Sequence, residues 1–207
     1  MRRSREMKVL GITGGVGSGK SKVLKYLETE YNAVVVQLDE VAKKLQRRGQ
    51  PCYEQIVAAF GETVVGTDRE LARDVLGQIV FADAGRLEIL NQIVHPAVKQ
   101  WVEEDISAKK QEQIPLYIIE AALLPNAGYV QICDEMWYIF TEETVRRGRL
   151  EVSRGYTQEQ ITRMIETQPD EEMFRRVCHV VIDNSGTFEQ TKQQIDYYYM
   201  RNEEEQK

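Results

Sequence analysis

The stretch Gly14-Gly15-Val16-Gly17-Ser18-Gly19-Lys20-Ser21 matches the pattern G-x-x-x-x-G-K-[ST]. This pattern is typical of the P-loop, a glycine-rich turn whose backbone N–H groups cradle phosphate oxygens. The apolar run 8–13 precedes it, and residues 23–31 follow with apolar side chains at helical spacing. Strand, glycine loop and helix are the context that the motif requires. The stretch therefore predicts a nucleotide-binding site rather than an incidental glycine-rich turn.

Each residue type in this loop has a physical role. Glycine permits positive φ and close approach of the backbone to a ligand, and the N-terminus of the following helix favours anions. Lys20 is expected to reach the β- and γ-phosphates, and the Ser21 hydroxyl to bind Mg²⁺. The candidate ATP-binding residues of this segment are Gly14, Gly15, Val16, Gly17, Ser18, Gly19, Lys20, Ser21 and Lys22.

Composition narrows the class of protein. The 207 residues can bury one sizeable core, and the net charge of -6 argues against a nucleic-acid partner, which usually meets a basic face. Cys52, Cys133 and Cys178 are odd in number and widely spaced, so we expect reduced thiols in a cytoplasmic protein. No segment is long enough to span a membrane. The arginines near the N-terminus precede too short an apolar run for an export signal, and Met1 or Met7 can be the start.

Five apolar segments read as strands: 8–13, 33–36, 116–119, 136–140 and 179–182. Helical patterns separate them, which predicts the α/β class with a five-stranded parallel sheet flanked by helices and right-handed crossovers. We expect a single domain, 1–207, with its core at 7–48, 112–140 and 178–202, a helical insert at 49–111 and a helical segment at 141–177, here called the lid segment.

For two residues outside the loop, Asp39 and His95, position in the sequence does not decide between a functional and a structural role. Asp39 follows the second strand, at the edge where ligands of open α/β sheets bind, but a helix N-cap explains it equally well. In the insert, one helix is expected to end at His95 and another to begin at Pro96, because proline is tolerated at a first helical position. A lone histidine is more often structural than functional.

The lid segment gathers arginines in a chain of negative charge. A solvated helical hairpin with surface arginines is the plain explanation. Its place just after a strand favours a mobile lid whose arginines clamp a transferring phosphate. Thr157 with Gln160, and Thr187 with Gln190, predict capping boxes, and the tyrosines 197–199 are expected to pack against the sheet.

Over nearly its whole length the sequence resembles the dephospho-coenzyme A kinase family. Residues 13–21 match T-G-G-x-G-S-G-K-S, Asp39 matches the second acid of D-A-D, and His95-Pro96 match the end of a leucine-rich helix. Further matches are Arg73, Phe81, 119–124, Arg149-Leu150 through Arg154, Gln168 and 179–186. The departures are Gln37 for the first acid of D-A-D, Glu120 for a common Asp, Lys22 for Thr and His179 for Asp, and none removes an obvious catalytic group.

The resemblance implies a P-loop kinase with a nucleoside-monophosphate-kinase-like fold, a helical acceptor-binding insert and a helical lid. It implies transfer of the γ-phosphoryl of ATP, with Mg²⁺, to the ribose 3′-hydroxyl of dephospho-coenzyme A. Asp39 would orient or deprotonate that hydroxyl, and Lys20, Arg149 and Arg154 would act on the phosphates. The remaining implied roles are acceptor binding by Asp39, Arg73, His95 and Glu120, and adenine binding by Asn184 and Gly186. A monomer is favoured, without nucleic-acid or membrane partners.

Three other functions are weighed against this one. Another small-molecule P-loop kinase, such as a nucleoside monophosphate kinase, shares the plan, but His95-Pro96 and Asn184-x-Gly186 favour the coenzyme A branch. A GTPase switch is disfavoured because the D-x-x-G match at 183–186 comes too late and no N-K-x-D follows. A catalytically silent nucleotide-binding module is disfavoured because the loop lysine and the candidate carboxylate are both present.

Overall fold

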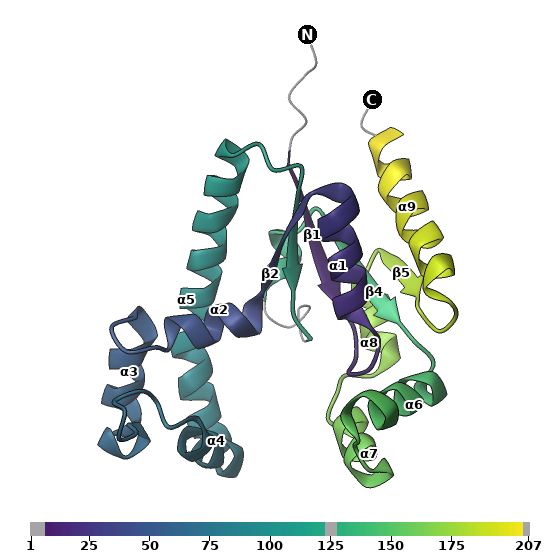
Figure 1. The fold of residues 1–207 in the computed structure, drawn as a ribbon. Coiled ribbons are helices and arrows are strands. Elements are labelled where there is room, and N and C mark those ends of the chain that lie inside the picture. Colours follow the sequence, from purple (N-terminus) through teal and green to yellow (C-terminus); the bar gives the residue numbers. More distant parts are fainter. Residues whose placement is uncertain (1–6, 123–127, 205–207) are drawn as a thin grey trace. The chain divides into compact units, whose positions relative to one another are not determined.

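The computed structural model describes residues 7–122 and 128–204, the last three by their backbone only (Figure 1). Leu123 and Leu124, which belong to one of the matched motifs, lie outside the described residues. The chain divides into two compact units: Met1–Val35 with Glu112–Lys207, and Val36–Gln111. None of the described helices has both the length and the apolar character needed to cross a membrane.

The first unit is built on a sheet of five strands: β1 (Lys8–Thr13), β2 (Ala33–Gln37), β3 (Leu116–Glu120), β4 (Glu135–Phe140) and β5 (Val180–Asp183). The spatial order is β2-β3-β1-β4-β5. β1 pairs in parallel with β3 and β4, and β4 pairs in parallel with β5. The predicted five-stranded parallel sheet is confirmed. Since β1 lies in the middle, the P-loop leaves the sheet between the ends of β3 and β4.

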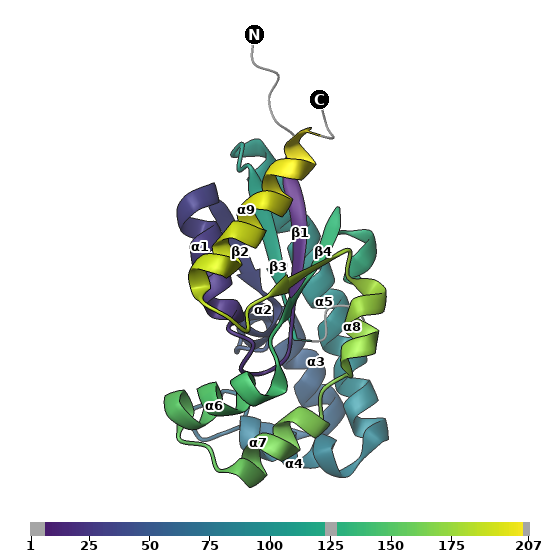
Figure 2. The ribbon, with the colours of Figure 1, turned by 90° about the vertical axis from the view of Figure 1, so that its right-hand side faces the viewer.

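Helices cover both faces of this sheet. α1 (Lys20–Tyr31) and α9 (Phe188–Glu204) lie on one face, and α8 (Glu171–Val177) lies on the other (Figure 2). Successive strand residues alternate between these faces. Trp137 meets Tyr198 of α9 edge to face, whereas its neighbour Tyr138 stacks on Phe174 of α8 with ring centroids 4.8 Å apart. Two further helices, α6 (Glu143–Arg154) and α7 (Gln158–Glu166), form the lid segment with α8.

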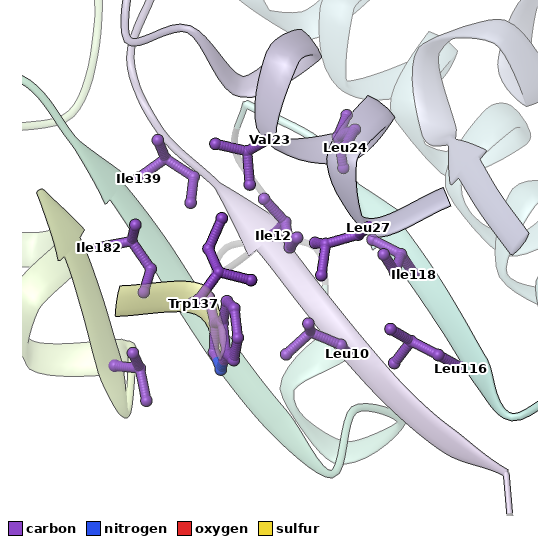
Figure 3. Close-up of a cluster of buried hydrophobic side chains, with 12 residues drawn as sticks. Leu10, Ile12, Val23, Leu24, Leu27, Leu116, Ile118, Trp137, Ile139 and Ile182 are labelled. Carbon is purple, nitrogen blue, oxygen red and sulfur yellow. The ribbon is translucent and has the colours of Figure 1, made fainter. Parts of the chain in front are cut away.

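The core of the first unit fixes α1 against the sheet. Leu10 and Ile12 of β1 pack with Val23, Leu24 and Leu27 of α1 (Figure 3). Each fully buried aliphatic side chain of this kind stabilises the fold by about 1.5–3 kcal/mol. The position of the loop between β1 and α1 is therefore set by packing on both of its flanks.

The expectation for the three tyrosines of α9 is met in part. Tyr198 and Tyr199 pack against the core cluster, as predicted. Tyr197 is 61% exposed, so the prediction was wrong for this residue. The reason is helical rotation, because three consecutive residues of a helix cannot all face one side.

The second unit is helical. α2 (Leu38–Leu45), α3 (Pro51–Phe60) and α4 (Arg73–Ala82) all pack on α5 (Ala84–Gln111), and a 3₁₀ turn, η1 (Glu62–Val64), precedes α4. Because α2 packs on α5, this unit begins at Val36, whereas the insert was expected to begin at 49. Its core includes Val94, Val98 and Val102 of α5.

The predicted helix boundary at Pro96 is wrong, because α5 is continuous and Pro96 lies inside it. A proline removes one backbone donor and costs a helix interior about 3 kcal/mol. Val94, Val98 and Val102 are spaced by four residues, so they share one buried face across the proline. Their burial, at about 1.5–3 kcal/mol each, outweighs the cost of the lost hydrogen bond.

Candidate active site

The P-loop joins β1 to α1 and ends in a helix N-terminus that carries no side-chain cap. Gly17 and Gly19 have φ of +76° and +81°, which is the left-handed region that favours glycine. Gly19 is the N-cap of α1 and has no side chain to cap the helix by a hydrogen bond. The first amides of α1 and the helix dipole can therefore meet an anion, which is the arrangement that binds phosphate.

Lys20 folds back over the loop that precedes it. Its Nζ donates to the carbonyl oxygen of Gly14 and lies 3.8 Å from Glu120 Oε1. The two side chains are only 15% and 14% exposed. Glu120 ends β3 and stands in register with Ile12 of β1, which explains why its carboxylate meets the loop. A positive and a negative group thus lie together where the loop leaves the sheet.

Residues that directly follow β4 and β5 form hydrogen bonds with the backbone of the P-loop. The buried amide of Asn184 donates to the carbonyl oxygen of Ser18 at 2.7 Å and accepts from Thr191 at 2.8 Å. Thr141, directly after β4, donates to the same Ser18 oxygen at 3.0 Å. Asn184 was expected to bind ATP, and its side chain supports the loop. Thr141 was not predicted as a site residue, although a threonine directly after a buried strand is a signal that could have found it.

Two arginines of α6 reach the loop or its support. Arg149 donates to the backbone oxygen of Asn184 at 2.7 Å and to Thr141 Oγ1 at 3.4 Å. Arg146 donates through Nε to the carbonyl oxygen of Val16 at 2.9 Å and through Nη2 to Gln168 Oε1 at 3.0 Å. Arg146 was not predicted as a site residue. Its spacing of three from Arg149 on one helix was the signal that could have found it.

Arg154 differs from these two arginines. It is exposed as the last residue of α6, just before Gly155, whose φ of +65° ends the helix. No hydrogen bond or ion pair joins Arg154 to the other described residues. The capping box of Thr157 and Gln160 begins α7 as predicted. The structure thus brings Arg149 to the loop and leaves Arg154 at the turn of the hairpin.

Three of the expected acceptor-binding residues belong to the second unit. Asp39 is exposed in the first turn of α2, where a carboxylate is stabilised by the helix dipole. Gln37 is the N-cap of this helix, so the alternative that Asp39 is the N-cap was wrong. Arg73, at the start of α4, donates to the backbone oxygen of Lys43 in α2 at 3.2 Å. His95 is exposed on α5, so burial gives no support to a core role.

The residues present fit a magnesium ion carried by the nucleotide. Ser21 exposes its side chain in the first turn of α1. Among the side chains that the structure describes, in residues 7–122 and 128–201, no group of three histidine, cysteine or acidic residues could hold a metal by itself. Mg²⁺ usually keeps several waters and takes few protein ligands beside substrate phosphates. A single hydroxyl next to a phosphate-binding loop is consistent with that pattern.

These features define a P-loop kinase: a parallel sheet, a P-loop whose lysine lies at the carboxyl end of the central strand, and arginines of the lid segment against the loop. Comparison with known proteins specifies the family. The family model described as dephospho-CoA kinase matches residues 8–190, and this chain belongs to that family. The dephospho-CoA kinase of Geobacter sulfurreducens is 34% identical over 191 residues, covering 92% of this chain and 96% of its own.

One further relative and two solved structures are similar to this chain. The dephospho-CoA kinase of Symbiobacterium thermophilum is 34% identical over 190 residues, which is 92% of this chain and 79% of its own. The crystal structure of TT1252 from Thermus thermophilus has a TM-score of 0.80 at 27% identity, covering 95% of this chain and 98% of its own. Shikimate kinase from Acinetobacter baumannii shares the fold, with a TM-score of 0.51 at 13% identity and coverage of 95% and 94%.

Proposed function

We propose that this chain transfers the γ-phosphoryl group of ATP to the ribose 3′-hydroxyl of dephospho-coenzyme A, giving coenzyme A and ADP. This reaction is the final step of coenzyme A synthesis. The observation that carries the proposal is the placement of Lys20 on the P-loop beside Glu120, in a chain that matches the family over residues 8–190. A cytoplasmic monomer is part of the proposal, and sedimentation of the purified protein tests the monomer.

The donor side needs charge and alignment more than covalent chemistry. The amides at the start of α1 would hold the β-phosphate, and Lys20 would leave the Gly14 carbonyl to contact the β- and γ-phosphates. Arg149 lies close enough to the loop to stabilise charge on the transferring group. Mg²⁺, held by the Ser21 hydroxyl and the phosphates, would neutralise part of the nucleotide charge.

The acceptor side needs a carboxylate for the ribose hydroxyl. A bond forms between the 3′-oxygen and the γ-phosphorus while the bond from that phosphorus to the β–γ bridging oxygen breaks. The hydroxyl proton would pass to Asp39, which is exposed two residues after β2. Glu120 is the second candidate carboxylate, and Arg73 and His95 would bind the rest of the acceptor.

A coupled ADP-release assay tests this function. With ATP and Mg²⁺, the kcat/KM for dephospho-coenzyme A should be at least about a hundredfold higher than for AMP, CMP or shikimate. Sites that hydrogen-bond a matching substrate often discriminate by more than this. Phosphorus NMR of the product should show a new 3′-phosphomonoester. The Lys20→Ala variant controls for contaminating kinases. Preferred turnover of AMP or CMP would instead indicate a nucleoside monophosphate kinase.

A further inference from the structure

The tip of the P-loop is held by two side chains of the lid segment. The carbonyl oxygen of Val16 accepts from Arg146 Nε at 2.9 Å, and the N–H of Val16 donates to Gln168 Oε1 at 3.1 Å. The same Oε1 accepts from Arg146 Nη2 at 3.0 Å. Three hydrogen bonds therefore close a ring among Val16, Arg146 and Gln168. We call these three residues the Val16 clamp.

A side chain on either glycine beside Val16 would press on residues of the lid segment. A Cβ on Gly15 would lie 2.7 Å from Arg146 Nη2 and 2.8 Å from Gln168 Oε1. A Cβ on Gly17 would lie 3.0 Å from Leu150 Cγ and 3.1 Å from the backbone oxygen of Arg146. The P-loop pattern leaves both positions open. Packing of the lid segment against the loop therefore gives a physical reason for glycine at both.

The clamp also places positive charge beside the loop. The hydrogen bonds of Arg146 to described residues go to two neutral oxygens, those of Val16 and Gln168. Partial burial lowers the pKa of Arg146, but the guanidinium stays charged at neutral pH because its usual pKa is far higher. A partly buried cation with neutral acceptors gains from an anion that binds nearby. Phosphate binding would supply that anion.

From these contacts we propose that Arg146 and Gln168 are positioning residues for the nucleotide. They hold Val16, and with it the loop, in the conformation that receives the phosphates, and so couple nucleotide binding to the lid segment. The proposal rests on the proposed function only in requiring that the loop binds nucleotide. Because both side chains bond the P-loop and each other, the affinity for the acceptor should be independent of them.

The test is calorimetric binding of ADP to the whole protein, with four variants. Arg146→Gln and Gln168→Met each break the clamp and should weaken ADP binding about tenfold, the scale of a lost hydrogen bond to a charged group. Arg146→Lys keeps the charge but loses the planar guanidinium, whose Nε and Nη2 reach the Val16 and Gln168 oxygens separately, so this variant should bind ADP as weakly as Arg146→Gln. The matched control is Arg147→Gln, because Arg147 is the next residue of α6 and bonds Glu143 and Thr162 within the lid segment. The ADP affinity of Arg147→Gln should stay within about twofold of that of the wild type.

Three further measurements separate a positioning role from a loss of stability alone. The ADP affinity of the double variant Arg146→Gln/Gln168→Met should lie within about twofold of that of either single variant, because each single substitution already breaks the same hydrogen-bonded ring. Amide exchange of residues 14–20 in nucleotide-free protein should speed up in the clamp variants and not in Arg147→Gln. The KM for ATP should rise while the KM for dephospho-coenzyme A stays unchanged.

The outcomes are distinct. Wild-type ADP affinity in both Arg146→Gln and Gln168→Met, with a lowered melting temperature, would reduce the clamp to a structural contact and overturn the proposal. Full ADP affinity in Arg146→Lys would show that charge alone acts, which also overturns positioning. Wild-type protein that binds ADP but does not phosphorylate dephospho-coenzyme A would refute the proposed function and leave the clamp intact.

Discussion

Gly19→Ala tests whether the loop conformation depends on glycine at the N-cap of α1. Gly19 has φ of +81°, and an alanine there costs about 1–2 kcal/mol through its Cβ. That Cβ would also collide with Asn184 Nδ2, an atom that is buried and hydrogen-bonded to Ser18 rather than a flexible chain end. Moving the amide breaks its bonds to Ser18 and Thr191, each worth about 1 kcal/mol.

These contributions predict a loss of about 3–4 kcal/mol in the free energy of unfolding. For a chain of this size that corresponds to a melting temperature lower by roughly 10 °C. Since the amides of the loop shift with Gly19, ADP affinity measured by calorimetry on the folded variant should fall at least about tenfold.

Gly148→Ala is the matched control. Gly148 lies inside α6, and a Cβ there would meet no atom within 4 Å. This variant should gain about 0.5–1 kcal/mol in the free energy of unfolding, because glycine is costly inside a helix, and ADP affinity should not change. If Gly19→Ala melts within 2 °C of wild type and binds ADP within about twofold, the contacts between Gly19 and Asn184 do not set the loop conformation.

Four further predictions concern the transfer itself. Lys20→Ala should abolish turnover in the ADP-release assay at an unchanged melting temperature, because a charge contact to the phosphates is worth about 3 kcal/mol or more in the transition state; near-normal activity would refute the assignment. Asp39→Asn should lower kcat roughly a hundredfold, the scale of a positioned acid–base group, with ADP affinity unchanged; full activity would place the acceptor carboxylate elsewhere. Hydrogen exchange of residues 141–168 should slow when ATP analogue and acceptor are both bound, and unchanged exchange with binding shown by calorimetry would argue against a closing lid. Arg149→Lys should lower kcat at least about tenfold, and Arg154→Lys less; equal effects would contradict the distinction between the two.

The sheet was predictable because its signal is local. A strand that is buried on both faces of a parallel sheet is a continuous apolar run, so all five strands lie within a residue or two of their expected bounds. The P-loop and the capping box at Thr157 are local as well, since their partners lie within a few residues. Interactions between groups that are close in sequence can be predicted because they require particular residue types at fixed spacings.

The predicted helix boundaries at Pro96 and Asp39 were wrong because packing of apolar side chains outweighs the local preference of each residue. Pro96 prefers a first helical position, but the buried face of α5 continues across it. Asp39 is a good N-cap residue, yet the N-cap of α2 lies two residues earlier, at Gln37, and Leu38 is buried as the first helical residue. In both cases the burial of apolar side chains on a neighbouring helix fixes the boundary.

Arg146 and Thr141 left a signal in the sequence, but the backbone oxygens to which the side chains around the P-loop donate were not predictable from it. Arg146 and Val16 are 130 residues apart, and Asn184 and Ser18 are 166 apart. In each pair a side chain bonds a backbone oxygen, and a backbone oxygen carries no residue identity that a sequence pattern could reveal. Only the fold, which sets the ends of β4 and β5 beside the loop, brings these groups together.

Helical geometry separates the two lid arginines that the sequence left equivalent. Arg146 and Arg149 are three residues apart, so they share the face of α6 that meets the loop. Arg154 is five residues beyond Arg149, which rotates it by roughly 140° from that side chain. A Cβ on Gly19 would lie 3.4 Å from Arg149 Nη1, whereas Arg154 is exposed at the end of the helix. We therefore infer that Arg149 is placed to contact the phosphates from the observed conformation, and that Arg154 can do so only after the hairpin moves.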